Sequence, residues 1–372
     1  MQKNIAVVFG GLSSENEVSI VTGVMAANLL DGARYAVWPV YIAQNGGFFT
    51  GKALLDTENF REGRRRFIPA AIAEGRLYER HGKKWRELCR LDGALNCCHG
   101  RGGEDGAVAG LLDLNGIPCA SPGIMPSSVF MDKAAAKLIA RSLGVPVLPW
   151  LRICEADYAR RSAFAVRCIE ERLKYPVIVK PVRSGSSIGI SVAEDRARLT
   201  FALNAAFAYD TAVIAEKFLE KRREVNCAAY KKGEEVVVTP CEEPKTEHKF
   251  LTFADKYMGT AKTGGGTFPA DIPPALSEKV RGYTKLLYRR TEMTGIVRAD
   301  FLLSEGEVYF NEMNTVPGAL AWYLASEKLA GFGQVLTALI EQGICDYRAR
   351  AGKKMLANCG VLRTCRGKGR RE

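Results

Sequence analysis

Short apolar runs alternate with helical patterns over the first 120 residues of the chain. Each apolar run has the length of a buried strand, and glycine or a polar turn closes it. Ser14 and Glu17 have the spacing of a capping box in front of the first helical pattern. Strands that alternate with helices predict a parallel sheet covered by helices. The predicted strands are 4–10, 37–42 and 93–98, and the predicted helices are 18–30 and a shorter helix that ends at Asn115-Gly116.

The pattern changes twice further along the chain. Strands at 175–180 and 212–216 enclose a helix at 197–209, and helical stretches flank 145–151. From about residue 224 the pattern becomes antiparallel. We therefore predict an α/β fold, α+β in its C-terminal part, with an N-terminal parallel-sheet domain. The predicted units are 1–123, 124–222, 223–345 and a basic tail 346–372. In the unit 223–345 we predict a helix at 275–294, a hairpin at 295–314 and a helix at 332–342.

Composition adds limits on the class of protein. The chain has 372 residues, 53 basic and 41 acidic, with a net charge of +12. No apolar run approaches the length of a membrane span, and the N-terminal run is too short for a signal peptide. Eleven cysteines without a CxxC pair indicate free thiols in a reducing cytosol. The charged segment 48–90 is interpreted as a surface insertion.

The hairpin at 295–314 carries the most informative polar residues. Side chains alternate across a strand, so Arg298 and Asp300 share one face, and Glu312 and Asn314 share one face of the next strand. A two-residue turn at Glu305-Gly306 would put the two sets on opposite faces. We therefore predict a three-residue loop or a bulge. Two carboxylates and an amide oxygen are suitable ligands for Mg²⁺, although exposed polar positions on a solvated strand give the same pattern.

Three further segments hold candidate ligand-binding residues. Lys180 ends a buried strand and precedes a Ser/Gly loop, as at phosphate sites, although the segment is not a P-loop. His99 and Glu15 follow predicted parallel strands, at the edge where open α/β sheets bind ligands. Lys256 and Tyr257 lie in a long polar, glycine-rich stretch at 242–267, which is typical of a lid. Capping or solvated side chains would explain each segment separately.

Taken together and in this order, the motifs resemble the D-alanine–D-alanine ligases of the ATP-grasp superfamily. The N-terminal GGLSSENEVS segment, the HGRGGEDG run from His99 to Gly106, and the Glu312-x-Asn314-Thr-x-Pro-Gly318 segment match the motifs of that family. Met131-Asp-Lys133, Lys180 with Ser186-Ser187, and Arg298-x-Asp300 match it as well. The resemblance covers about residues 1–340 and implies an ATP-grasp fold.

The resemblance also implies a role for each matched position. Glu15 would hold the amine of the first D-alanine, Ser186 would link Glu15 to Tyr257, and His99 would lie near the substrates. Arg298 and the amide of Gly318 would stabilise the oxyanion. ATP would be bound by Lys133, Lys180, Ser187, Glu216, Lys217, Leu219, Glu224 and Lys256, two Mg²⁺ (or Mn²⁺) ions by Asp300, Glu312 and Asn314, and the second substrate near Tyr323 and Leu324.

The implied activity is ATP-dependent ligation of two D-alanines through an acyl phosphate, for peptidoglycan precursors. The family usually carries a serine where this chain has Tyr323, so D-serine or D-lactate stays open as acceptor. Tyr257 in its FADKY context favours D-alanine over D-lactate. A non-catalytic nucleotide-binding or nucleic-acid-binding protein is the remaining alternative. The resemblance further implies a cytoplasmic homodimer that acts on small D-amino acids, without nucleic-acid or membrane partners.

Overall fold

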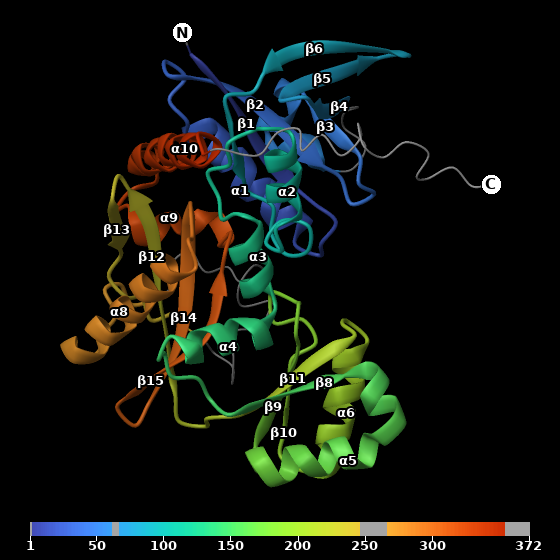
Figure 1. Cartoon of the computed structure of the whole chain (residues 1–372), viewed down its shortest axis with the longest axis vertical. Helices are drawn as coiled ribbons and strands as arrows, with labels where there is room; N and C mark the ends of the chain where they lie inside the picture. Colours follow the sequence, from blue (N-terminus) through green and yellow to red (C-terminus); the bar gives the residue numbers. More distant parts are fainter. Residues whose placement is uncertain (1, 62–66, 246–265, 354–372) are drawn as a thin grey trace, which may run out of the picture.

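The computed structural model describes residues 2–61, 67–245 and 266–353. Three sheets follow one another along the chain, with the third between the other two in space (Figure 1). Helices pack on all three sheets, and the parallel strands belong to the first. This arrangement confirms the predicted α/β class with antiparallel structure in the later part of the chain.

The N-terminal sheet has seven strands in the order β6-β5-β4-β3-β2-β1-β7. Only β2, β1 and β7 are mutually parallel, because β3 to β6 add antiparallel strands at one edge. The segment interpreted as a surface insertion is therefore largely part of the sheet. The elements are β1 (Lys3–Gly10), α1 (Asn16–Leu29), β2 (Tyr35–Ile42), β3 (Phe48–Thr50), the 3-10 helices η1 (Lys52–Leu55) and η2 (Thr57–Phe60), β4 (Ile68–Ala73), β5 (Arg76–His81), β6 (Lys84–Arg90), β7 (Gly93–Asn96) and α2 (Ala107–Leu114).

The predicted capping box of α1 is wrong. Glu15 is the N-cap residue, and no side-chain hydrogen bond caps the helix. Instead, the Ser13 hydroxyl accepts a hydrogen bond from the Glu15 amide and donates one to the His99 carbonyl. The start of the helix is thus held by the neighbouring strand end, which leaves the Glu15 side chain available for another partner.

The central sheet is antiparallel, in the order β10-β9-β11-β8. Its apolar face packs on α5 and α6, in a core that includes Val177, Val179 and Leu203. Two helices, α3 and α4, connect it to the N-terminal sheet (Figure 1). The elements are α3 (Ile124–Met131), α4 (Lys133–Ser142), β8 (Trp150–Cys154), α5 (Glu155–Leu173), β9 (Val177–Pro181), β10 (Ser191–Ala193), α6 (Arg196–Phe207) and β11 (Ala212–Lys217).

The third sheet has the order β13-β12-β14-β15, and α8 covers one of its faces. The hairpin β14–β15 turns at Glu305-Gly306, where both residues have positive φ, as a tight two-residue turn requires. A bulge lies further along: Phe301 pairs with Phe310, whereas Asp300 pairs with Glu312. Asn311 is the extra residue, and the predicted bulge is confirmed. The elements are β12 (Arg223–Lys232), β13 (Glu235–Val238), α8 (Pro274–Arg290), β14 (Ile296–Ser304) and β15 (Glu307–Asn314).

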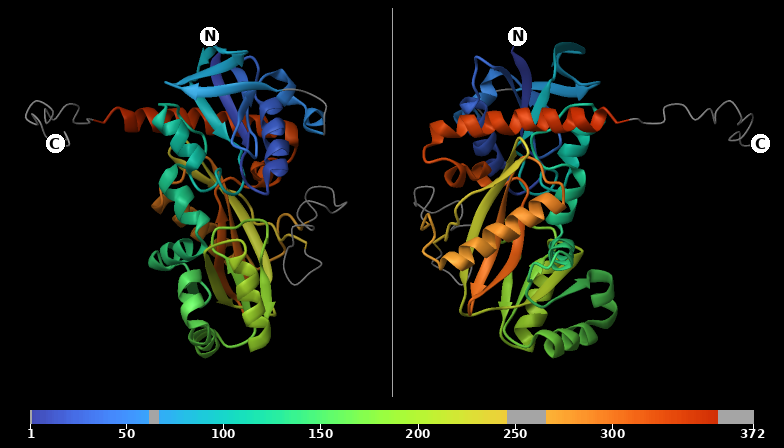
Figure 2. Two further views of the ribbon diagram at one scale, coloured as in Figure 1. Left: turned by 90° about the vertical axis from the view of Figure 1, so that its right-hand side faces the viewer. Right: turned by 60° about the vertical axis from the view of Figure 1, so that its left-hand side comes forward.

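The chain then returns to the N-terminal sheet. After η3 (Gly318–Ala321) and α9 (Trp322–Ala325), α10 (Leu329–Ala351) runs across the molecule beside that sheet (Figure 2). Phe332, Leu336 and Ile340 of α10 share a core with strands β1 and β7. The helix is longer than predicted at both ends, and its last turns enter the segment that was assigned to the basic tail.

Candidate active site

Glu15 and Ser186 meet although they are 171 residues apart. The Ser186 hydroxyl donates to the Glu15 carboxylate, and both side chains are buried. Gly100 and Gly185 enclose the same carboxylate: a Cβ atom at either position would lie 2.7 Å or 2.8 Å from Glu15 Oε2. The close packing explains why both positions are glycine. The structure therefore brings together the candidate residues for binding the first substrate.

Ser186 lies in a strained turn. Ser186 and Ser187 both have positive φ, of 51° and 60°, and residues other than glycine rarely adopt such values. Each such residue costs about 1–3 kcal/mol, and this kind of strain is found mainly at functional sites. The turn follows β9, so Lys180 and Ser186 come from one strand end and the loop after it.

Both ring nitrogens of His99 have partners. Nδ1 lies 2.7 Å from the Val316 carbonyl, which only accepts, so Nδ1 carries the proton. Nε2 lies 2.8 Å from Thr22 Oγ1, and the Ala319 amide donates to that hydroxyl at 3.1 Å. Burial lowers the pKa of His99, against the charge of Glu15, so the ring is neutral. His99 thereby holds the loop 316–319, which contains Gly318.

Glu104, to which the sequence analysis gave no role, strengthens the same junction. Its carboxylate accepts from the Gly100 amide at 2.8 Å and from the Val316 amide at 3.3 Å. Its backbone carbonyl accepts from the Thr315 hydroxyl at 3.1 Å. Burial and the neighbouring charge of Glu15 raise the pKa of Glu104 to about 8. The HGRGGEDG segment therefore joins the first and third sheets.

The four polar residues of the β14–β15 hairpin converge. Arg298 forms a two-point ion pair with Asp300, at 2.7 Å and 2.8 Å. Asn314 Nδ2 donates to Asp300 Oδ2 at 3.1 Å, and Glu312 is the direct cross-strand partner of Asp300. Burial would lower the pKa of Arg298, but Asp300 and then Tyr323 hold it well above its usual value. The guanidinium is therefore a permanent cation.

The oxygen donors of this hairpin suit magnesium. Asp300 and Glu312 are adjacent carboxylates on one face, and Asn314 adds an amide beside them. Mg²⁺ in proteins typically takes one or two carboxylates and fills its remaining positions with water and substrate phosphates. Within the described ranges, no group of three or more His, Cys, Asp or Glu side chains forms a separate metal site. The donor set therefore fits ions shared with a phosphate ligand.

Lysines from the central unit face this hairpin. Lys133 Nζ lies 3.4 Å from Glu312 Oε2 and donates to the Ser184 carbonyl at 2.6 Å. Lys180 Nζ lies 3.1 Å from Asn311 Oδ1, the side chain of the bulge residue. Both lysines are buried at more than nine-tenths of their surface. Their charges lie close to the oxygen donors of Glu312 and Asn311, as a phosphate site between the two sheets requires.

A buried cluster of charges lies next to Lys180. The sequence analysis named Lys180 and Glu216 but not Lys137. Glu216 lies 3.2 Å from Lys137 Nζ and 3.4 Å from Lys180 Nζ. Glu216 and Lys137 are each 1% exposed. Burial alone would raise the pKa of Glu216, but the two lysines lower it. The side chain of Glu216 is thus engaged by two lysines.

The remaining predicted nucleotide residues lie where β11 leads into β12. Lys217 Nζ donates to the Tyr175 carbonyl at 3.1 Å, so its side chain fixes the neighbouring segment. Arg222 donates to the Leu219 carbonyl at 2.7 Å and lies 3.5 Å from Glu224 Oε1. These contacts hold the segment that connects the central and third sheets. Lys256 and Tyr257 lie outside the described residues.

Comparisons with known proteins agree with this arrangement. The family pattern described as D-ala D-ala ligase N-terminus matches residues 4–122, and the one described as D-ala D-ala ligase C-terminus matches residues 139–344. The chain belongs to this ligase family. Among its curated relatives, the D-alanine--D-alanine ligase of Thermosipho africanus is 35% identical over 360 residues, 94% of this chain and 95% of the relative. That of Thermosipho melanesiensis is 33% identical over 354 residues, covering 93% and 94%.

Solved ligase structures share the fold. D-Alanine-D-Alanine Ligase from Helicobacter pylori superposes with a TM-score of 0.74 at 28% identity, covering 91% of this chain and 98% of that one. VanG D-Ala:D-Ser Ligase from Enterococcus faecalis superposes with a TM-score of 0.76 at 26% identity, covering 91% and 99%. The family fold and the expected ATP-grasp architecture are therefore confirmed.

In this ligase, the segment after Pro317 is wound left-handed. Ala319, Leu320 and Ala321 all have φ near 50°, an arrangement that is unfavourable for L-residues. The winding brings Tyr323 under Arg298, with Tyr323 OH 3.5 Å from Nη1. Leu324 is instead buried in the core that α10 shares with β1. Tyr323 thus lies beside Arg298, and the side chain of Leu324 packs away from it.

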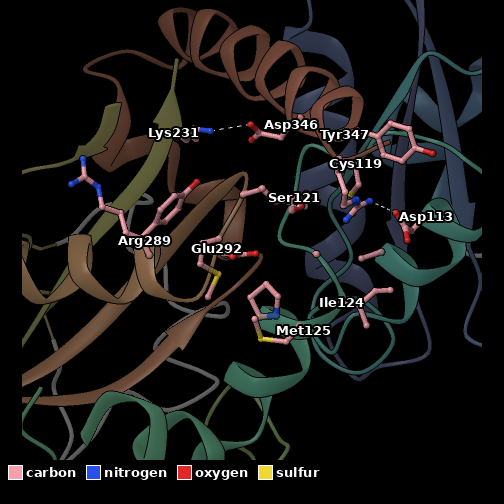
Figure 3. A pocket seen from close by; sticks show the side chains of 18 of the residues that line it. Asp113, Cys119, Ser121, Ile124, Met125, Lys231, Arg289, Glu292, Asp346 and Tyr347 are labelled. Atoms are coloured by element: carbon pink, nitrogen blue, oxygen red, sulfur yellow. Dashed lines mark hydrogen bonds and ion pairs between the residues drawn. The ribbon is translucent and has the colours of Figure 1, made fainter. Parts of the chain in front are cut away.

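A cavity of about 690 Å³ lies elsewhere, between α2, α3, α8 and α10 (Figure 3). Two ion pairs cross it, Lys231 with Asp346 at 2.9 Å and Arg350 with Asp113. None of the predicted site residues lines it. Four of its charged residues are therefore paired with each other. No described helix is long and apolar enough to cross a membrane, and the cysteines of the described ranges are free thiols.

Proposed function

We propose that this chain joins two D-alanines in an ATP-dependent reaction. The products are D-alanyl-D-alanine, ADP and phosphate, and the route is an acyl phosphate of the first D-alanine. A carboxylate repels an attacking amine, and phosphorylation converts it into an acyl group with a good leaving group. Family membership and the site geometry both support this reaction.

One observation carries the proposal: a series of contacts links the N-terminal, central and C-terminal motifs of the family. Glu15 is bonded to Ser186, and two residues earlier the Ser184 carbonyl accepts from Lys133. Lys133 in turn lies beside Glu312. A substrate held at Glu15 therefore lies on the same side as the charges of the hairpin. This proximity is what transfer of a phosphate to the substrate carboxylate requires.

The chain's own residues divide the work as follows. Glu15 binds the ammonium of the first D-alanine, and Lys133 and Lys180 bind ATP phosphates. Asp300, Glu312 and Asn314 would hold two magnesium ions, which would supply positive charge at the phosphate oxygens. Arg298 stabilises the oxyanion that forms at the carbonyl.

The remaining assignments concern the loops around the reacting groups. The amide of Gly318 assists Arg298, and His99 fixes the loop that presents that amide. Glu216, Lys217 and Leu219 form the adenine hinge, and Glu224 binds the ribose. Ser187 and Lys256 contact phosphates, and Tyr257 closes the lid over the acyl phosphate. Water must be kept from that intermediate.

We further propose D-alanine as the acceptor and the cytoplasm as the compartment of the reaction, with a homodimer as the assembly. The D-alanine--D-alanine ligases that cover more than nine-tenths of the chain support this choice of acceptor. The VanG D-Ala:D-Ser ligase shares the fold at lower identity and makes D-serine the comparison substrate.

The deciding experiment follows ADP release and identifies products by mass spectrometry. Purified protein with ATP, Mg²⁺ and D-alanine should release ADP and form D-alanyl-D-alanine, whereas L-alanine should give neither. Arg298→Met should abolish product, and the exposed Arg290→Met should not. Absence of ADP release with every D-amino acid would exclude the ligase assignment, and a preferred mixed product with D-serine would replace the acceptor.

A further inference from the structure

A row of polar side chains extends the hairpin site across two more segments. Glu312 is opposite Asp300, Asp300 is opposite Asn226 on β12, and Asn226 is opposite Glu242. The backbones of Asn226 and Glu242 exchange two hydrogen bonds, at 2.9 Å and 2.8 Å. Directly opposite residues in a sheet project from the same face. Glu242 and Asn226 therefore lie on the face that carries the proposed metal ligands.

The neighbouring residues confirm this orientation. Cys241 and Cys227 project to the other face, into the core beneath α8. Glu243 also points away and pairs at two points with Arg223, at 2.7 Å and 2.6 Å. Of the two adjacent glutamates, only Glu242 therefore faces the site.

Glu242 and Asn226 present acceptor atoms in a buried place. Each residue is 5% exposed. Asn226 lies opposite Glu242, and its Oδ1 is buried with no hydrogen-bond partner in the described part of the chain. A buried polar atom without a partner is costly, and such atoms commonly await a ligand. A carboxylate and an amide oxygen side by side call for a cationic ligand with several donors.

Arg298 and Tyr323 lie next to this row of side chains. Burial raises the pKa of Glu242, while the positive charge of Arg298 opposes that rise and Asp300 adds to it. Burial raises the pKa of Tyr323, the charge of Arg298 opposes that rise, and the charge of Glu242 adds to it. Arg298, which is assigned to the oxyanion, lies two positions from Asp300 on β14 and 3.5 Å from the Tyr323 hydroxyl.

We propose that Glu242 and Asn226 bind the α-ammonium of the acceptor amino acid. The inference rests on the proposed ligase function and adds the residues that hold its second substrate. An α-ammonium has three donors and matches the Glu242 carboxylate together with Asn226 Oδ1. Its nitrogen is the atom that must reach the acyl carbonyl, and Arg298 marks the place of that carbonyl. Tyr323 borders the same subsite and offers its hydroxyl to the acceptor.

The test separates acceptor binding from formation of the acyl phosphate. Hydroxylamine is a small nucleophile that can trap an acyl phosphate as a hydroxamate without an amino-acid acceptor. Wild-type enzyme, Glu242→Gln and Asn226→Ala are assayed with ATP, Mg²⁺ and D-alanine, with and without hydroxylamine. Glu243→Gln is the matched control, because its side chain pairs with Arg223 on the other face.

We expect the ratio of dipeptide to hydroxamate to fall about tenfold or more in Glu242→Gln, as for loss of a charged hydrogen bond. Asn226→Ala should lower the ratio in the same direction, with the Michaelis constant for the acceptor raised and hydroxamate formation kept. Glu243→Gln should stay within about twofold of wild type. An unchanged ratio, or equal loss of both products, would overturn the inference. If wild-type enzyme forms neither product, the ligase function itself fails.

Discussion

The buried cluster of Lys137, Glu216 and Lys180 permits a quantitative prediction. We consider Lys137→Met, which removes one cation and keeps most of the side-chain volume. Lys137 Nζ lies 3.2 Å from Glu216 Oε2, and both residues are 1% exposed. At an effective dielectric constant of about 20, that distance corresponds to an attraction of about 5 kcal/mol. The cost of burying both charges offsets much of it.

Removing one partner of a buried ion pair costs about 3–5 kcal/mol, because the remaining charge is left buried. Lys180 still neutralises Glu216 at 3.4 Å, so we expect the lower end, about 3 kcal/mol. Urea unfolding followed by circular dichroism measures the loss. The double variant Lys137→Met/Glu216→Gln should lose less stability than the two single variants added together.

The matched control is Lys221→Met, because Lys221 is exposed. It should change stability by less than about 0.5 kcal/mol. Lys137 does not reach the phosphate site, so its variant should keep the Michaelis constant for ATP, whereas Lys180→Met should raise it. A Lys137→Met enzyme as stable as the control would refute the reasoning, since the cluster would then contribute nothing.

Three further predictions concern the site and its supports. Asp300→Asn should raise the Mg²⁺ concentration needed for half-maximal activity by about 10–100-fold, and an unchanged magnesium titration would contradict its role as a ligand. Gly103→Ala should lower stability by about 1–3 kcal/mol in urea unfolding, because the new Cβ would lie 2.2 Å from the Cys98 carbonyl oxygen. Gly123→Ala is the control: its new Cβ would meet open space, so stability should not change. Burial lowers the pKa of His99 below its unfolded value of about 6.5, so the stability from this neutral ring is present above that pH and is lost as the pH falls below it. His99→Gln should therefore flatten the decline of the urea midpoint between about pH 7 and 5. An equal slope in the variant and the wild type would argue against a neutral ring.

Local patterns were sufficient for much of the fold and for the hairpin. Parity along 298–314 required a three-residue loop or a bulge, because the polar residues on both strands had to share a face, and a bulge occurs at Asn311. The strands β4 to β6 were not predicted. β5 and β6 carry many charges, and β6 is an exposed edge strand that needs few apolar positions. The last turns of α10 were missed for a similar reason, as their basic residues resemble a solvated tail.

The candidate site was predictable where a motif has a fixed spacing. Lys137 and Glu242 were missed because their importance depends on burial and on partners distant in sequence. Lys137 looks like any lysine of an amphipathic helix until Glu216 is placed 3.2 Å away. Glu242 is one of two adjacent glutamates, and only the strand register shows which of them faces inward.

The bulge at Asn311 also bears on how this hairpin can change length during evolution. Loss of Asn311 would leave Glu312 opposite Asp300 and would remove only the contact with Lys180. Loss of a residue between the turn and Phe310 would instead displace the aromatic pairing with Phe301 or separate the two carboxylates. Insertions and deletions of one residue should therefore be tolerated at 311 and selected against at its neighbours, and gaps in alignments of related ligases should fall there.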